Sequence, residues 1–106
     1  MPKYLVEASY TADGLKGLHK DKASGRHKVL SAAAEAMGGK VESFHFALGE
    51  HDVVAIVEVP DISSIAAICM AASSSGLVRT RTTALMTVEE TDRALGLKTV
   101  YRAPGK

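Results

Sequence analysis

The chain has 106 residues, of which 46% are hydrophobic and 24% are charged. This composition is typical of a soluble globular domain. A net charge of +1 provides no strong field to attract nucleic acid or an anionic membrane. With 5% aromatic residues and no tryptophan, the chain also has little material for stacking on nucleic-acid bases. We therefore expect neither nucleic acid nor a membrane as a partner.

The cysteine content and the hydropathy pattern narrow the class further. Cys69 is the only cysteine, which excludes an internal disulfide and a Cys-based metal cluster. No run of about 18 apolar residues is present, and the first ten residues do not resemble a signal peptide. These features predict a cytoplasmic protein of one domain, with its core in residues 3–88 and a short helix and tail in residues 89–106.

The N-terminal part of the chain predicts a strand followed by an interrupted helix. Residues 3–10 alternate in polarity, and Glu7 falls on the more polar face of that strand. Thr11 is a candidate N-cap for the helix that follows. The polar segment 19–25 predicts a break, after which helical spacing resumes and continues to Gly38.

The middle of the chain predicts a hairpin. Residues 41–48 and 53–59 have the composition of strands, and Gly49 to Asp52 form the turn between them. We expect Gly49 to adopt a positive φ. We expect the carboxylate of Asp52 to accept backbone N–H bonds that hold the reversal.

The remaining residues predict a second helix and a fourth strand. Asp61 is a candidate N-cap for an alanine-rich helix that ends near Ser75. Helical spacing defines an apolar stripe on this helix, formed by Ile62, Ile65, Ala66, Cys69, Met70 and Ser73. We therefore expect Cys69 to be a buried structural thiol. Residues 77–88 alternate as a strand with Arg79 and Arg81 on one face.

The order of elements is β-α-β-β-α-β, which predicts an α+β, ferredoxin-like fold. Its four-stranded antiparallel sheet has the order 4-1-3-2, and both helices lie on one face. The third strand is apolar on both faces, because Val54 and Ile56 alternate with other aliphatic residues. An exposed apolar sheet face is unusual on a monomer. We therefore expect a homodimer or higher even oligomer in which two sheets pack face to face, as in a dimeric α/β barrel.

Several short motifs occur together along the chain. They are Thr11-x-x-Gly14-Leu15-Lys16, Arg26, Gly38-Gly39, Gly49-x-x-Asp52-Val53-Val54, Glu58-x-Pro60-Asp61 and Ser74-Ser75-Gly76-Leu77-Val78-Arg79-Thr80. In this combination the chain resembles the GYD-domain family, over residues 3 to about 88. The resemblance implies a ferredoxin-like domain of the dimeric α/β-barrel type, in a family of small, largely uncharacterised proteins, and it implies no established substrate.

The chain departs from the family pattern at the signature itself. The Gly-Tyr-Asp signature reads Gly49-Glu50-His51-Asp52 here, so His51 stands where tyrosine is usual. The resemblance also leads us to expect an aromatic residue near His45. An imidazole can replace a hydroxyl as a hydrogen-bond donor or acceptor, and it adds a titration near neutral pH.

The candidate ligand-binding residues are polar side chains of the strands and of the hairpin turn. They are Glu7, His45, His51, Asp52, Glu58, Arg79 and Arg81. If the faces align, the glutamates and arginines of this set converge on the open side of the sheet. Such a cluster could bind an anionic or carbonyl-bearing ligand, with one glutamate as general base. We favour instead an ion-pair network across the dimer seam, or edge-strand arginines exposed to solvent.

The histidines suggest one further possibility. His45 and His51 could approach each other across the hairpin and, with Asp52 or Glu50, hold a divalent metal ion. No metal-binding spacing repeats in the sequence, however, and we favour a surface histidine at the turn and a half-buried one in the strand. The sequence therefore predicts no metal and no cofactor.

Two functions remain open at this point. The first is a small dimeric domain, without catalysis, that binds a small-molecule ligand or assembles with partners through its open sheet face. The second is a cofactor-independent small enzyme, of the monooxygenase, isomerase or decarboxylase kind. Its pocket would lie between the sheet and the helices or at the dimer seam. The second rests on analogy between folds, and fold alone does not determine function.

Overall fold

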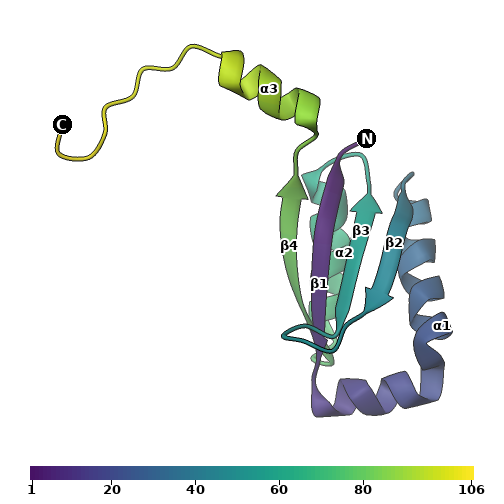
Figure 1. Ribbon diagram of the computed structural model, residues 1–106. Coiled ribbons are helices and arrows are strands. Elements are labelled where there is room, and N and C mark those ends of the chain that lie inside the picture. The colour runs from purple at the N-terminus through teal and green to yellow at the C-terminus, as the bar shows by residue number, and fades with distance from the viewer.

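The computed structural model describes residues 1–106 as a four-stranded sheet with helices on one face (Figure 1). Its elements are β1 (Lys3–Tyr10), α1 (Ala12–Ala36), β2 (Lys40–Phe46), β3 (Val53–Glu58), α2 (Ile62–Ser74), β4 (Val78–Leu85) and α3 (Val88–Gly96). This order confirms the predicted succession of strands and helices. The short terminal helix is also where the sequence places it.

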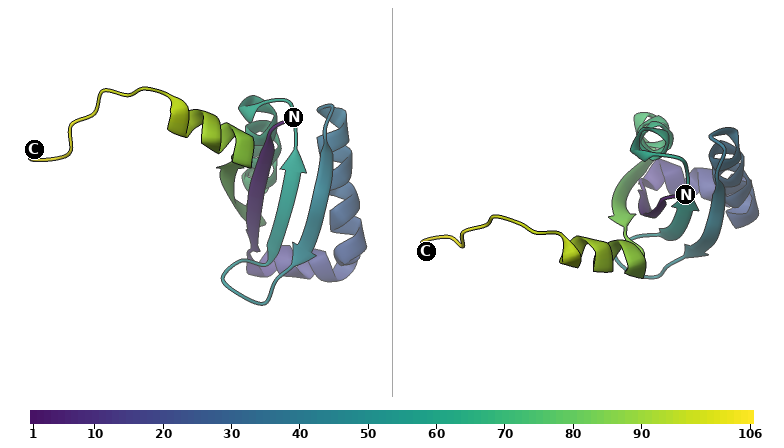
Figure 2. Two further views of the ribbon diagram at one scale, coloured as in Figure 1. Left: turned by 45° about the horizontal axis from the view of Figure 1, so that its top comes forward. Right: turned by 90° about the horizontal axis from the view of Figure 1, so that it is seen from above.

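The strands lie in the order β2-β3-β1-β4, and every neighbouring pair is antiparallel. Counted from the opposite edge this order is 4-1-3-2, so β1 and β3 are the two central strands. Figure 2 shows α1 and α2 on the same side of the sheet, which leaves the other side without a helix. We call this uncovered side the open sheet face.

The core lies between the sheet and the two helices. Alternate residues of the central strands point into it, among them Tyr4 and Val6 of β1 and Val57 of β3. Ala34 of α1 and Ile65 of α2 pack against these residues from the helix layer. The predicted alternation of β1 and β3 is therefore confirmed, because the residues expected to share a face are buried together.

Helix α2 begins where the sequence predicts, but it presents a different face to the core. The backbone N–H of Ser64 donates to the Asp61 carboxylate over 3.0 Å, and this bond lowers the pKa of Asp61. The predicted stripe is wrong in part, since Ile62 is 67% exposed and Met70 is 70% exposed. Alanine and isoleucine occur all around this helix, so its periodicity selects no single face.

Cys69 lies on the side of α2 that faces β4. It is half-buried rather than buried, and its Sγ lies 3.3 Å from Thr82 Oγ1. The thiol therefore contacts a hydroxyl group of β4 as well as the core. Because β4 is an edge strand, this side of α2 is less enclosed than the side over the central strands.

Helix α1 is longer and less interrupted than predicted. The break expected over residues 19–25 is reduced to one residue, Lys22, with φ 68° and ψ 164°. Figure 1 shows the result as two legs, one crossing the end of the sheet and the other running alongside β2. A non-glycine residue in this region of φ and ψ costs about 1–3 kcal/mol and persists only where the surrounding structure requires it. Contacts of α1 with β1 and β2 hold the bend.

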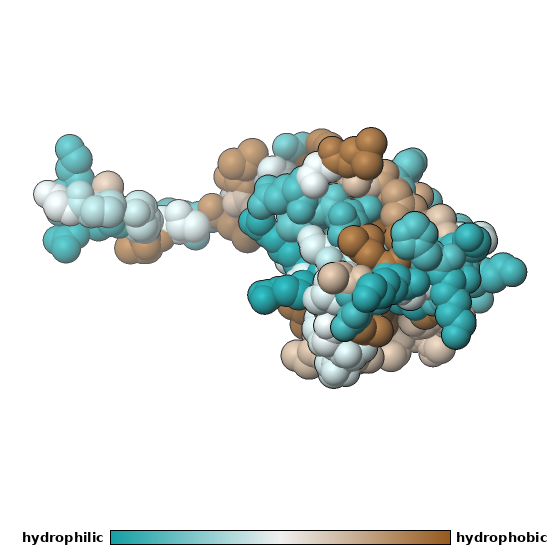
Figure 3. Space-filling view, turned by 90° about the horizontal axis from the view of Figure 1, so that it is seen from below, coloured by the Kyte–Doolittle hydropathy of each residue, from teal (hydrophilic) through white to brown (hydrophobic).

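Helix α3 stands apart from the rest of the molecule. Thr87 and Glu90 form a reciprocal capping box at its start, and the hydrogen bond from the Thr87 backbone lowers the pKa of Glu90. No residue of α3 is buried. Figure 3 shows this helix and the following tail extending away from the body of the protein.

None of the helices combines the length and the apolar character needed to cross a membrane.

Two glycines near the hairpin differ sharply in their surroundings. Gly49 does not have the positive φ that the sequence predicts, and a Cβ there would meet nothing within 4 Å. The reversal extends over residues 47–52, and this longer loop needs no tight turn at Gly49. Gly39, in contrast, lies so close to β3 that a Cβ would overlap the carbonyl oxygen of Glu58.

We predict that Gly39→Ala lowers the free energy of unfolding by about 1–3 kcal/mol, because the strands must separate to admit the added methyl group. The matched change Gly49→Ala should alter it by less than about 0.5 kcal/mol. Urea unfolding followed by circular dichroism measures both. Equal stability of the two variants would show that Gly39 does not approach β3 as described.

Candidate functional site

The open sheet face carries a set of polar side chains from its two adjacent strands β1 and β4. The register pairs Glu7 with Arg81 and Ser9 with Arg79. Residues paired in this way project from the same face of an antiparallel sheet. The structure thus brings Glu7, Arg79 and Arg81 to one face, as predicted.

The loop between β2 and β3 is attached to β1 by Asp52. The backbone N–H of Tyr10 donates to Asp52 Oδ2 over 2.8 Å, and the backbone N–H of Asp52 donates to the Ala8 carbonyl over 2.8 Å. Within the loop, the N–H of Ala47 donates to the Asp52 carbonyl. Asp52 accepts a backbone N–H as predicted, but the donor is in β1 rather than in the turn. The loop is therefore held beside the central strand, as Figure 1 shows.

His51 lies next to this attachment and contacts two side chains of β1. Its Nδ1 is 3.2 Å from Ser9 Oγ, and its Nε2 is 3.7 Å from Glu7 Oε2. The side chains of His51 and Glu7 are 19% and 24% exposed. When protonated, His51 forms a partly screened ion pair with Glu7 at the surface of the sheet.

These side chains border a hollow of about 350 Å³, which we call the polar pocket. None of its lining residues is hydrophobic, and they are Glu7, Ser9, Glu50, His51, Arg79, Thr80 and Arg81. Four of the predicted candidates meet here. Ser9 and Thr80 were not among the predicted candidates, although the alternation of β1 already places Ser9 on the face of Glu7, and Glu50 was named only as a possible metal ligand. Nothing in the sequence shows that the loop brings Glu50 to the same place.

Glu58 does not join this cluster, and the predicted convergence of the two glutamates is wrong. Glu58 is paired with Lys3, whereas Glu7 is paired with Val54, four residues away along β3. At the rise of a strand this separation is about 13 Å. Lys40 Nζ lies 3.4 Å from Glu58 Oε2, so Glu58 pairs with a lysine and not with Arg79 or Arg81. Strand register decided this outcome, and it is not visible in the sequence.

Lys3 and Glu42 form a second charged pair at this end of the open face. Lys3 Nζ donates to Glu42 Oε1 over 2.7 Å, and this hydrogen bond raises the pKa of Lys3. Both side chains are about two-fifths exposed, so the pair contributes little to stability. The end of the open face that contains Glu58 therefore carries lysine–glutamate pairs, and the other end carries the polar pocket.

His45 lies on the outer strand β2, opposite Val54, and is exposed rather than half-buried. The histidines do not meet, because His51 turns toward β1. No group of three or more His, Cys, Asp or Glu side chains is placed to hold a metal ion. An edge strand has a neighbour on one side only, which explains the exposure of His45.

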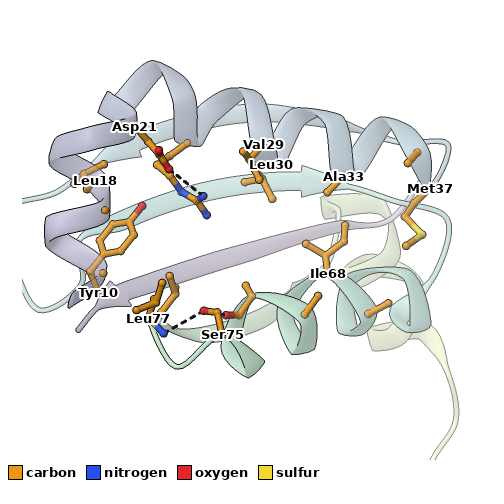
Figure 4. Close-up of a pocket in the computed structure, with 18 residues that line it drawn as sticks. Tyr10, Leu18, Asp21, Val29, Leu30, Ala33, Met37, Ile68, Ser75 and Leu77 are labelled. Carbon is orange, nitrogen blue, oxygen red and sulfur yellow. Dashed lines mark hydrogen bonds and ion pairs between the residues drawn. The ribbon is translucent and has the colours of Figure 1, made fainter. Parts of the chain in front are cut away.

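A second cavity of different character lies on the other side of the sheet, between α1 and α2 (Figure 4). We call it the helix groove. Its volume is about 540 Å³, and 13 of its 18 lining residues are hydrophobic. Tyr10 and Asp21 lie at one end and Met37 lies at the other (Figure 4).

The geometry defines a class: a ferredoxin-like domain with an open sheet face, a polar pocket on that face and an apolar groove behind it. The family model of the GYD domain matches residues 4–95 of the sequence, which is most of the chain. The protein therefore belongs to the GYD-domain family. Neither the curated proteins nor the solved structures provided a match.

We predict that Asp52→Ala lowers the free energy of unfolding by about 1.5–3 kcal/mol, because it removes a hydrogen bond between a carboxylate and the Tyr10 N–H. Glu50→Ala, two residues earlier in the same loop, is the matched control and should change it by less than about 0.5 kcal/mol. Chemical denaturation measures both changes. A similar effect of the two substitutions would mean that Asp52 does not hold the loop to β1.

Proposed function

We propose that the protein acts as a homodimer whose open sheet faces pack together, and that its polar pocket binds a small anionic ligand. The centre of the open face is apolar, with Leu5, Val54 and Ile56 half-buried and uncovered by any helix. Sheets that pack face to face lie about 10 Å apart, which allows such side chains to interdigitate. Membership of the GYD-domain family agrees with this proposal.

The ligand chemistry follows from the donors in the polar pocket. Arg79 and Arg81 supply planar guanidinium groups, which suit the paired oxygens of a carboxylate or a phosphate. His51 and Ser9 add further donors beside them. The observation that carries the proposal is the alignment of Glu7 with Arg81 beside His51, since it gathers opposite charges around the half-buried side chains of Glu7 and His51. In the dimer, partial burial would strengthen these interactions.

A second function is supported by the sequence of contacts from Ser9 through His51 to Glu7. A histidine held between a hydroxyl and a carboxylate can accept a proton from a bound molecule and return it. The protein would then be a cofactor-independent enzyme that transfers a proton, for example an isomerase. Replacement of His51 by glutamine separates the two functions, because the amide retains hydrogen bonding but cannot take up the proton.

We predict that light scattering at micromolar concentration gives a mass that is twice that of the 11.2 kDa chain, or a higher even multiple of it. Ile56→Lys should yield monomers, because it places a charge at the centre of the packed faces. Leu48→Lys, at a fully exposed loop position, should leave the oligomer intact. A wild-type protein that remains a monomer would contradict the proposed assembly.

We predict that inorganic phosphate binds the polar pocket and that Arg81→Gln weakens this binding at least tenfold. Loss of one charge-assisted hydrogen-bonding group is worth about 1.5–3 kcal/mol. Arg93→Gln, on the exposed helix α3, is the control and should bind phosphate as the wild type does. Calorimetric titration at low ionic strength measures the affinities. Equal binding by wild type and Arg81→Gln would exclude the pocket as the anion site.

A further inference from the structure

We propose that the helix groove is a separate binding site for a monocarboxylic acid with an apolar body. The acid group would lie beside Arg26 and Tyr10, and the body would extend toward Met37. This site is on the helix side of the sheet, whereas the polar pocket is on the open sheet face. The two sites share no residue, so either can be tested without the other.

The groove exists because α1 and α2 pack over opposite edges of the sheet. The second leg of α1 packs against β2, and α2 packs against β4. The facing sides of the two helices carry small side chains, which are Ala33 and Ala36 on α1 and Ala67, Ala71 and Ala72 on α2. Small residues leave space that larger ones would fill. The resulting volume of about 540 Å³ lies in the usual range for small-molecule sites, about 300–1,000 Å³.

One end of the groove is polar. Arg26 Nη1 lies 3.8 Å from Asp21 Oδ2, which is longer than a hydrogen bond. The guanidinium therefore retains donors for another partner, and its side chain is 30% exposed. Figure 4 shows this ion pair at the same end of the groove as Tyr10 and Leu18. A planar guanidinium and a phenol hydroxyl at the same end of the groove provide suitable donors for a carboxylate.

The bend of α1 builds this polar end. Asp21 precedes the strained residue Lys22 and Arg26 follows it, and both line the groove. The first leg of α1 crosses the end of the sheet, so that Gly17 and Leu18 close the groove there. Backbone strain of this kind persists where the surrounding structure requires it and is frequent at binding sites. The strained backbone at Lys22 and the polar end of the groove therefore belong to the same bend of α1.

The charge around this end favours an anion. Helix α1 contains five basic and three acidic side chains, and most of the basic ones lie near the bend. Figure 3 shows hydrophilic side chains around hydrophobic ones at this end of the molecule. A positive surface beside an apolar groove selects an apolar molecule with a negative group over a neutral or cationic one. A bound carboxylate would compete with Asp21 for Arg26.

Decanoate is a suitable probe, and the decyltrimethylammonium cation has the same tail with the opposite charge. We expect calorimetric titration of the full chain to show one decanoate site per chain and at least tenfold weaker binding of the cation. Arg26→Gln should weaken decanoate binding at least tenfold, and Ala71→Phe should abolish it by filling the groove. Arg26→Lys, which retains the charge but not the planar fork, should give an intermediate affinity. Circular dichroism verifies that each variant is folded.

Arg93→Gln, on the exposed helix α3, is the matched control, because it removes a guanidinium outside both pockets and should leave decanoate binding unchanged. Equal affinities for decanoate and for the cation would show adsorption to an apolar surface and would overturn the proposal. Unchanged binding by Arg26→Gln or by Ala71→Phe would also overturn it. A third outcome is that decanoate binds the Leu95→Asp variant of α3 but not the wild type. The groove would then be occupied by the α3 helix of another copy, and the proposal would be wrong.

Discussion

Coverage of only one sheet face by helices is the constraint on which the rest of the structure depends. The succession of elements places α1 and α2 on the same side of the sheet, and no helix lies over Leu5, Val54 or Ile56. The hydrophobic effect favours the removal of such a face from water. The two cavities follow from the same arrangement. The open sheet face has a polar pocket at its edge, and the helix side has a groove where the helices lie apart.

The second important interaction is the attachment of Asp52 to β1. Its hydrogen bonds bring the loop to the central strand and place His51 beside Ser9 and Glu7. In this protein, histidine therefore occupies the position where the family resemblance implies tyrosine. Its two ring nitrogens reach both Ser9 and Glu7, which one tyrosine hydroxyl would not do in the same way. In this chain the segment from Gly49 to Asp52 is thus both a structural anchor, through Asp52, and a contact to the side chains of β1, through His51.

The fold was largely predictable, and the site was predictable only in part. A period of two residues correctly places Arg79 and Arg81 on one face of β4, since strand geometry alone determines it. That Glu7 of β1 shares this face follows from its pairing with Arg81, which the sequence does not show. The position of Glu58 depends on the register between strands, which no local pattern reveals. The loop length and its attachment to β1 were also hidden, and so the expected turn geometry at Gly49 was wrong. The core-facing side of α2 could not be predicted because that helix is apolar all round.

Solvent accessibility of side chains on the open sheet face is the most direct test of this account. Methyl relaxation by a soluble gadolinium chelate can be measured by NMR for Ile56, at the centre of that face, and for Leu48, which is fully exposed in the loop. If the open faces pack together, the chelate should broaden the Leu48 methyl signals strongly and those of Ile56 very little. Equal broadening of the two residues would show that the face stays open to water and would contradict the proposed dimer.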